Sequence, residues 1–145
     1  MLAPEKVVLY AEDSPDDRFF MAEAWKEAGC ERRLVMVEDG EQAVAYMSGA
    51  GVYADRGAYP LPGLVLLDLK MPKRTGLETL SWMRSTPVWK TVPVVLLTAS
   101  AAPADVTAAY GGGANVFMVK PTTAKELAGV AAAIRAHWLQ LVEYV

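Results

Sequence analysis

The sequence predicts an α/β protein, a (βα)5 chain whose five short strands form one doubly wound parallel sheet. Five runs of mostly apolar, β-prone residues are each followed by a longer segment with apolar residues at helical spacing. The runs are apolar throughout, so both faces of the sheet must be covered by helices. A chain of 145 residues can bury one such core, and we expect a single domain over residues 1–145.

The first strand–helix unit occupies residues 6–29. The run KVVLYAE, residues 6–12, is apolar until its last residue and predicts a strand. Ser14 can cap the helix that follows, Pro15 suits its first turn, and Gly29 ends it. The residues we expect on its buried side are Phe19, Met21, Ala22 and Trp25.

Two further units follow, with one long connection. Residues 33–39 predict the second strand and residues 40–49 its helix. Residues 64–68 predict the third strand and residues 76–85 its helix. The connection over residues 48–63 is long for a helix-to-strand link, where a few residues are usual. The inward side chains expected from spacing are Ala43, Val44, Met47, Leu77, Leu80 and either Met83 or Arg84.

The last two units complete the alternation. Residues 92–100 and 114–120 predict the fourth and fifth strands. Residues 103–112 predict a helix with Pro at its start and Gly at its end, and residues 123–142 predict the final helix. The apolar stripe of that final helix is Leu127, Val130, Ile134 and either Trp138 or Leu141.

Composition excludes several function classes. The net charge is −3 and no block of Lys or Arg occurs, which argues against nucleic-acid binding. No apolar run approaches the ~20 residues that span a bilayer, and no signal peptide is apparent, so we expect no membrane association. Cys30 is the only cysteine, which indicates a reducing compartment and a cytoplasmic location.

Five chemically active side chains follow the expected strands at their carboxyl ends, where open parallel sheets place their binding sites. Carboxylates gathered there repel one another unless a cation such as Mg²⁺ lies among them. A carboxylate beside a divalent cation and an amine can attack phosphorus and form an aspartyl phosphate, while a hydroxyl donates to the same oxygens. The five residues are Glu12, Asp13, Asp68, Thr98 and Lys120.

These residues sit in four motifs that resemble the receiver domain of two-component response regulators (CheY-like). The motifs are YAEDSPDD, LVLLDLKMPKRTG, VVLLTAS and VFMVKP, in this order. The resemblance covers essentially the whole chain. It implies a flavodoxin-like strand order 2-1-3-4-5 and a signalling module that catalyses only its own phosphorylation and dephosphorylation. It also implies that Asp68 takes a phosphoryl group from a sensor histidine kinase.

The resemblance assigns further roles. It implies that Glu12, Asp13, Asp68 and the backbone carbonyl of Lys70 hold Mg²⁺, with Mn²⁺ as an alternative cation. Thr98 and Lys120 are expected to contact the phosphoryl group. Thr98 and Phe117 form the expected switch, which acts on the fourth helix, fifth strand and fifth helix. The Lys120–Pro121 bond is expected to be cis.

Three stretches make the resemblance more specific. The run LLDLKMPKRTG and the long connection before it are most similar to single-domain regulators paired with bacterial phytochromes, as is the tail IRAHWLQLVEYV. A bacteriophytochrome is therefore a candidate kinase, and light signalling a candidate context. The chain departs from the common pattern at Glu12, where Asp is usual, and at Lys70, where a cation can pair with the acids and compete with Mg²⁺.

Two enzyme or cofactor-binding alternatives stay open. An aspartyl-nucleophile phosphatase that depends on Mg²⁺ needs a second acid two residues after the nucleophile, where this chain has Lys70. A flavin-binding flavodoxin needs a phosphate loop rich in Ser, Thr or Gly after the first strand, where EDSPDD would repel a phosphate. We expect Asp16, Asp17 and Asp39 to be solvated or to cap helices.

The apolar residues at the end of the chain predict that the protein forms a dimer. Apolar residues crowd the tail over residues 138–145, and a monomer would expose some of them. We expect an isologous homodimer built on the last helix, its tail and the neighbouring face of the fourth helix. The alternative is a tail that folds back on its own domain. The expected interface residues are Val106, Tyr110, Trp138, Leu139 and Val142.

Overall fold

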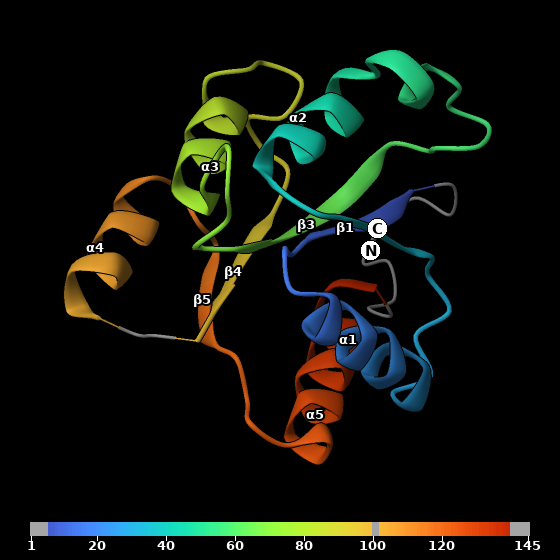
Figure 1. Ribbon diagram of the computed structural model, residues 1–145, viewed down its shortest axis with the longest axis vertical. Helices are drawn as coiled ribbons and strands as arrows, with labels where there is room; N and C mark the ends of the chain where they lie inside the picture. Colours follow the sequence, from blue (N-terminus) through green and yellow to red (C-terminus); the bar gives the residue numbers. More distant parts are fainter. Residues whose placement is uncertain (1–5, 100–101, 140–145) are drawn as a thin grey trace, which may run out of the picture.

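A single parallel sheet of five strands forms the centre of the computed structural model, which describes residues 6–99 and 102–139 (Figure 1). The strand order is β2-β1-β3-β4-β5, which confirms the predicted fold class and order. The strands are β1 (Val7–Ala11), β2 (Leu34–Val37), β3 (Pro62–Asp68), β4 (Val94–Thr98) and β5 (Val116–Val119). The three central strands are buried along their whole length, as their apolar runs predict.

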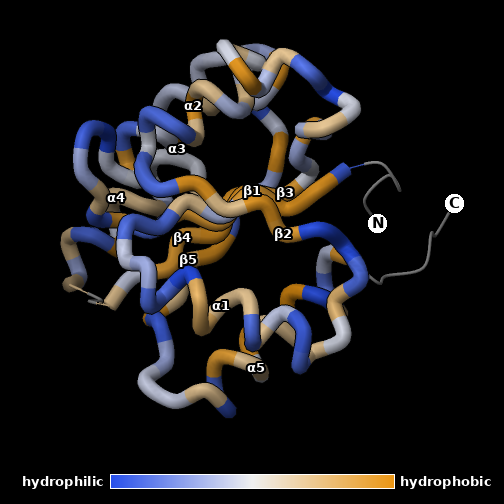
Figure 2. The backbone as a smooth tube through the Cα atoms, turned by 45° about the vertical axis from the view of Figure 1, so that its right-hand side comes forward, coloured by the Kyte–Doolittle hydropathy of each residue, from blue (hydrophilic) through white to orange (hydrophobic). Residues whose placement is uncertain are grey.

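Helices cover both faces of the sheet. Helices α1 (Pro15–Glu27) and α5 (Ala124–Ile134) pack side by side on one face (Figure 1). The other face carries α2 (Gly40–Ser48), α3 (Gly76–Arg84) and α4 (Pro103–Gly111). The hydrophobic strands therefore lie between two helical layers, with polar residues toward the outside (Figure 2).

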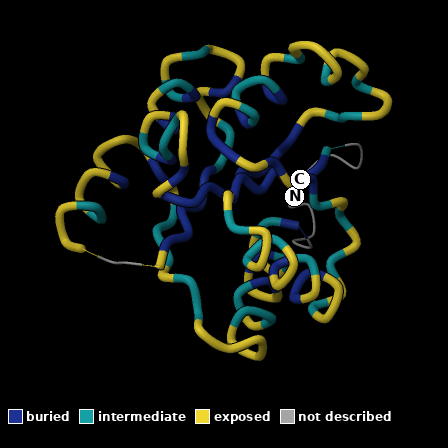
Figure 3. The backbone as a smooth tube through the Cα atoms, viewed as in Figure 1, coloured by how far each residue is buried: buried dark blue, intermediate teal, exposed yellow. Residues whose placement is uncertain are grey.

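The two faces have separate cores, because successive strand residues point to opposite sides. Val8 and Tyr10 of β1 pack toward Trp25 of α1 and Ile134 of α5. The residues between them, such as Leu9, belong to the core under α2 and α3. Burial is accordingly concentrated in the strands and in the inner sides of the helices (Figure 3).

The inward faces of two helices differ from the prediction. Phe19 is 60% exposed, because α1 turns its Met21, Ala24 and Trp25 toward the core instead. In α2 the buried aromatic residue is Tyr46, whereas Val44 is only half-buried. Spacing alone did not settle either helix, since each carries apolar residues on more than one side.

The long connection before β3 explains the burial of Tyr46. Its hydroxyl donates to the carbonyl oxygen of Pro60 at 2.8 Å, and its ring contacts those of Tyr53 and Tyr59 at 5.0 and 6.1 Å between centroids. Within the connection, Gly51–Ala54 forms a short 3-10 helix, η1. Arg56 donates to the carbonyl oxygens of Tyr46 and Met47 at the end of α2. The connection is therefore a packed part of the domain.

The end of the chain also differs from one continuous predicted helix. Helix α5 stops at Ile134, and Arg135–Leu139 (η2) continues as a π-helical turn. That turn places Leu139, 8% exposed, in the core of its own chain, which removes it from any surface open to a second copy. Val142 and the rest of residues 140–145 lie outside the described residues. In the described part, no helix is both long enough and apolar enough to cross a bilayer.

Candidate functional site

The side chains predicted from the sequence to form the site lie together at the carboxyl edge of the sheet. Asp68 and Thr98 are the last residues of the adjacent strands β3 and β4. Glu12 directly follows β1, and Lys120 directly follows β5. The backbone N–H of Lys120 donates to the carbonyl oxygen of Thr98 at 2.7 Å, which fixes the end of β5 beside β4. The predicted convergence at one edge is therefore present.

Three carboxylates form the acidic part of the site. Glu12, Asp13 and Asp68 each offer one oxygen, and these oxygens lie within 4.8 Å of one another. Glu12 is 1% exposed and Asp68 is 6% exposed, whereas Asp13 faces solvent. A set of hard oxygen donors with one open side fits Mg²⁺ or Mn²⁺, which retain water ligands when bound by a few carboxylates.

The environment of Glu12 is built by its neighbours in sequence. The Tyr10 hydroxyl donates to Glu12 Oε1 at 3.1 Å, and the backbone N–H of Ser14 donates to Oε2 at 3.1 Å. Arg18 donates to the Glu12 carbonyl oxygen at 2.6 Å and so ties α1 to the end of β1. Two of these contacts satisfy the buried carboxylate itself, whose lone pairs would otherwise be costly to bury.

Lys120 supplies the positive charge. Its Nζ lies 2.6 Å from Glu12 Oε1, 2.8 Å from Asp17 Oδ2 and 3.2 Å from Asp68 Oδ2. Burial lowers the pKa of Lys120, but hydrogen bonds to Asp17 and Glu12 and the charge of Asp68 outweigh burial and raise this pKa above its ordinary value. The ammonium is therefore charged at every physiological pH.

Burial also favours the neutral form of the acids, and for a carboxylate this raises the pKa. It raises the pKa of Glu12, although the hydrogen bonds from Lys120 and from the Ser14 N–H act against this shift. Burial and the nearby Glu12 carboxylate also raise the pKa of Asp13. The site consequently holds its negative charge at a cost in free energy, which a bound cation would offset.

The loop after β3 shapes the approach to Asp68. The backbone N–H of Gly76 donates to the Leu69 carbonyl oxygen at 2.9 Å, and a Cβ at residue 76 would lie 2.3 Å from the Asp68 carbonyl oxygen. Only glycine fits there. Met71 anchors the loop in the core, and Lys73 takes a positive φ of 68°, an uncommon conformation for a residue with a side chain.

Two predictions about this edge need correction. The Lys120–Pro121 bond is trans, since none of the described peptide bonds is cis, and the predicted cis bond is therefore wrong. Trans is the lower-energy form of an X–Pro bond, and it already brings Lys120 to the acids here. The side chain of Lys70 is exposed and makes no ion pair with the acids in the described structure; its backbone N–H lies 3.4 Å from Asp68 Oδ1.

Sequence reasoning missed two residues of the site. Asp17, assigned to solvent or to a cap, pairs directly with Lys120. Tyr10 contacts Glu12 from the same side of β1, and the two-residue period of a strand was a signal that predicts this contact. Asp39, by contrast, caps α2 as predicted by accepting from the Gln42 N–H at 2.8 Å.

The expected switch residue Phe117 lies in β5, half-buried against the core under α4. Its backbone N–H donates to the hydroxyl of Tyr110 in α4 at 3.1 Å. The structure thus links β5 to α4 through Tyr110, a residue on the predicted dimer face.

Known proteins match this arrangement. A family model for the response regulator receiver domain matches residues 8–132. The response regulator Rcp1 of Synechocystis is 35% identical over 139 residues, which are 96% of this chain and 92% of Rcp1. Its Mn²⁺-bound crystal structure has a TM-score of 0.83 and 35% identity, and covers 95% of this chain and 97% of that one.

Two further solved structures are similar, each with 31% identity and with 95% of this chain and 96% of the other covered. One is the phosphorylated cyanobacterial phytochrome response regulator RcpA, with a TM-score of 0.86. The other is response regulator RPA3017 in red light signaling of R. palustris, with a TM-score of 0.88. The fold, the acidic edge and these matches together place the chain in the response regulator receiver domain family.

Proposed function

We propose that this chain, as one receiver domain over residues 1–145, accepts a phosphoryl group on Asp68 from a sensor histidine kinase. The observation that supports this most directly is the position of the Asp68 carboxylate, 3.2 Å from Lys120 Nζ and beside two further acids. A bacteriophytochrome is the kinase that we favour, because RcpA is a phytochrome response regulator and RPA3017 takes part in red light signaling.

Each side chain of the site has its own role in the phosphoryl transfer. An Asp68 carboxylate oxygen attacks phosphorus, and the phosphorus–nitrogen bond to the kinase histidine breaks, its electron pair leaving with the imidazole. The Lys120 ammonium offsets charge on the transferring oxygens, and the Thr98 hydroxyl donates to one of them. Attack of water on the same phosphorus later returns free phosphate and the Asp68 carboxylate.

A divalent cation completes this site. Glu12, Asp13, Asp68 and the Lys70 carbonyl oxygen would hold it, and Mg²⁺ or Mn²⁺ fits their oxygen donors. When bound, such a cation neutralises charge on the phosphoryl oxygens. The Mn²⁺-bound form of Rcp1 supports this assignment for a 35% identical relative.

Asp13→Asn is expected to weaken Mg²⁺ binding by tenfold or more, roughly the effect of losing one charged oxygen ligand. Calorimetric titration of Mg²⁺ into the wild type and the variant measures the change. Asp16→Asn is the matched control, because it removes the same charge from an exposed position nearby and should bind as the wild type does. Equal affinity in Asp13→Asn would place the cation elsewhere.

Intact mass after incubation with acetyl phosphate and Mg²⁺ tests the proposed function. One phosphoryl group per chain, lost slowly, is the expected result. Rapid turnover of many phosphate esters without a stable adduct would instead indicate the phosphatase. A yellow protein that binds flavin and gains no phosphoryl group would indicate the flavodoxin-type alternative.

We further propose that phosphorylation shifts Thr98 toward the phosphoryl group and Phe117 inward, which changes the α4-β5-α5 face. The contact of Phe117 N–H with the Tyr110 hydroxyl offers a direct link from β5 to α4. A ligand shifts such an equilibrium only through contacts that differ between the two states, and the new phosphoryl oxygens provide them.

Thr98→Ala is therefore expected to accept phosphate yet lose most of the change in amide exchange over α4, β5 and α5. The reason is that the variant keeps the acceptor but lacks the hydroxyl that the phosphoryl group attracts. Exchange is compared before and after phosphorylation, with Thr98→Ser as the control that retains the hydroxyl and should respond normally. Equal responses in the wild type and Thr98→Ala would refute the coupling.

The α4-β5-α5 face is also our proposed homodimer surface. Tyr110 and Val119 are about half exposed there, Val106 is half-buried, and Trp138 packs partly against its own core. We expect light scattering after size exclusion to give the mass of a dimer. A chain ending at His137, which lacks Trp138 and the rest of the tail, should shift toward the monomer. A full chain that stays monomeric at high concentration, with and without phosphate, would discard the dimer.

A further inference from the structure

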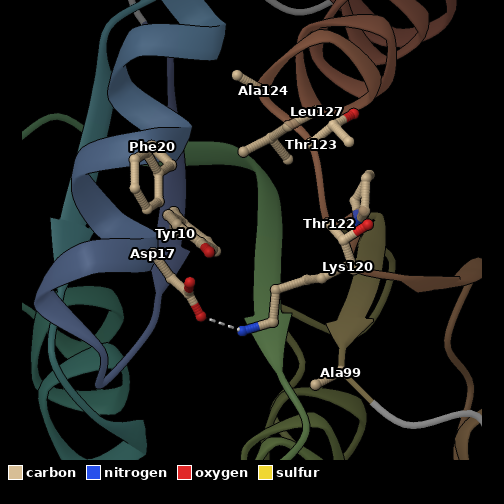
Figure 4. A pocket seen from close by; sticks show the side chains of 10 residues that line it. Tyr10, Asp17, Phe20, Ala99, Lys120, Thr122, Thr123, Ala124 and Leu127 are labelled. Atoms are coloured by element: carbon tan, nitrogen blue, oxygen red, sulfur yellow. Dashed lines mark hydrogen bonds and ion pairs between the residues drawn. The ribbon is translucent and has the colours of Figure 1, made fainter.

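Asp17 makes a contact at the site that none of the assigned roles uses. It lies in the first turn of α1, where its backbone N–H donates to the Ser14 Oγ cap at 3.2 Å. The cap holds this turn in place over the carboxyl end of β1. From there Asp17 Oδ2 reaches Lys120 Nζ at 2.8 Å across the groove between α1 and α5 (Figure 4).

Each of the three N–H donors of Lys120 already has a carboxylate partner. An ammonium group has three N–H donors, and three carboxylates take them here. The distances from Nζ are 2.6 Å to Glu12, 2.8 Å to Asp17 and 3.2 Å to Asp68. Lys120 therefore lies nearer to Glu12 and Asp17 than to the proposed phosphoryl acceptor.

The position of Asp17 also sets its electrostatic effect. Its side chain is 40% exposed and lines the groove with Lys120 and Tyr10, so it is not a buried structural acid. A carboxylate in hydrogen-bond contact with the ammonium cancels part of the positive field that Lys120 directs at incoming phosphoryl oxygens. The Asp17 carboxylate also adds a negative charge to this groove, which repels a dianionic phosphoryl donor. Both effects are expected to slow phosphoryl transfer to Asp68.

We propose that Asp17 is a positioning residue that draws Lys120 away from Asp68 and thereby slows phosphoryl transfer. Asp17 competes with the phosphoryl oxygens for the ammonium. The stronger the ion pair between Asp17 and Lys120, the weaker the contact between Lys120 and the phosphoryl group on Asp68. This inference rests on the proposed function, in which Asp68 accepts the phosphoryl group and Lys120 contacts it.

The test compares labelling by acetyl phosphate with Mg²⁺ in the wild type, Asp17→Asn and Asp16→Asn, followed by intact mass over time. Asp17→Asn should label roughly two- to fivefold faster, the range for one partly exposed ion pair. Asp16→Asn removes the same charge from the same exposed turn without the Lys120 contact and should label at the wild-type rate.

A second readout separates positioning from a purely structural role. Beryllofluoride mimics the phosphoryl group without a transfer step, and its affinity should rise by a similar factor in Asp17→Asn and in Asp17→Ala. An unchanged or slower labelling rate with unchanged beryllofluoride affinity, in variants that melt as the wild type does, would overturn the role of Asp17. If the wild type itself takes no phosphate, the proposed function fails first.

Discussion

Asp68→Asn is expected to abolish labelling by acetyl phosphate and to leave the fold intact. The amide has the size of the carboxylate but is not nucleophilic toward phosphorus, and no other acid in the described site approaches Lys120 from the end of β3. Intact mass after incubation with acetyl phosphate and Mg²⁺ should show no adduct. Circular dichroism should show the same secondary structure as the wild type.

The matched control for this variant is Asp39→Asn. Asp39 is another buried acid, 4% exposed, but it caps α2 through the Gln42 N–H. Asparagine is an equally good helix cap, so Asp39→Asn should fold and take one phosphoryl group. Normal labelling of Asp68→Asn, or its loss from Asp39→Asn in a folded chain, would count against Asp68 as the acceptor.

Lys120→Met is expected to slow labelling by about a hundredfold, as when one donor to a developing charge is removed. It should also lower the free energy of unfolding by about 3 kcal/mol near neutral pH, because buried Glu12 and Asp68 then lose their counter-charge. Labelling kinetics and urea denaturation measure the two effects. Lys125→Met, an exposed lysine in α5, is the control and should change neither.

The stability loss has a definite pH dependence. The pKa of Glu12 is already raised by burial in the folded wild type, and loss of the Lys120 hydrogen bond raises it further. The folded state then binds a proton more tightly than the unfolded state, so the variant loses stability as pH rises above the ordinary range of a Glu side chain. The cost of Lys120→Met should therefore be smaller near pH 5 than near pH 8. A cost that grows toward low pH would contradict this charge pairing.

In the wild type, the stabilising effect of Lys120 is lost only at high pH. Because the pKa of Lys120 is raised in the folded state, its stabilising effect is complete below the ordinary pKa of lysine and disappears as pH rises through the raised value. The pairing of Lys120 with the acids therefore supports the fold over the entire neutral range.

Strand-end reasoning predicted most of this site. Asp68 and Lys120 were placed together because parallel strands bring their carboxyl ends to one edge, and the two side chains do pair. The apolar runs predicted the sheet, since strands covered on both faces contain few polar residues. The strand order 2-1-3-4-5 came from the family resemblance, because alternation alone does not fix the order.

The contacts of Asp17, Tyr46 and Leu139 were not predicted for one physical reason: the direction of each side chain depends on tertiary contacts. Asp17 reaches Lys120 only because the first turn of α1 lies over the end of β1, a placement that helical spacing does not report. Tyr46 is buried by rings from the long connection, and Leu139 by a π-helical turn after α5. None of these contacts is encoded in a local pattern.

Mapping the modified residue tests the central claim most directly. Borohydride reduces an aspartyl phosphate to homoserine, so the chain is labelled with acetyl phosphate and Mg²⁺, reduced, digested and sequenced by tandem mass spectrometry. The predicted result is homoserine at position 68, with Glu12, Asp13 and Asp17 unchanged. A reduced residue at any other acid, or a labelled chain in which Asp68 stays intact, would contradict the account.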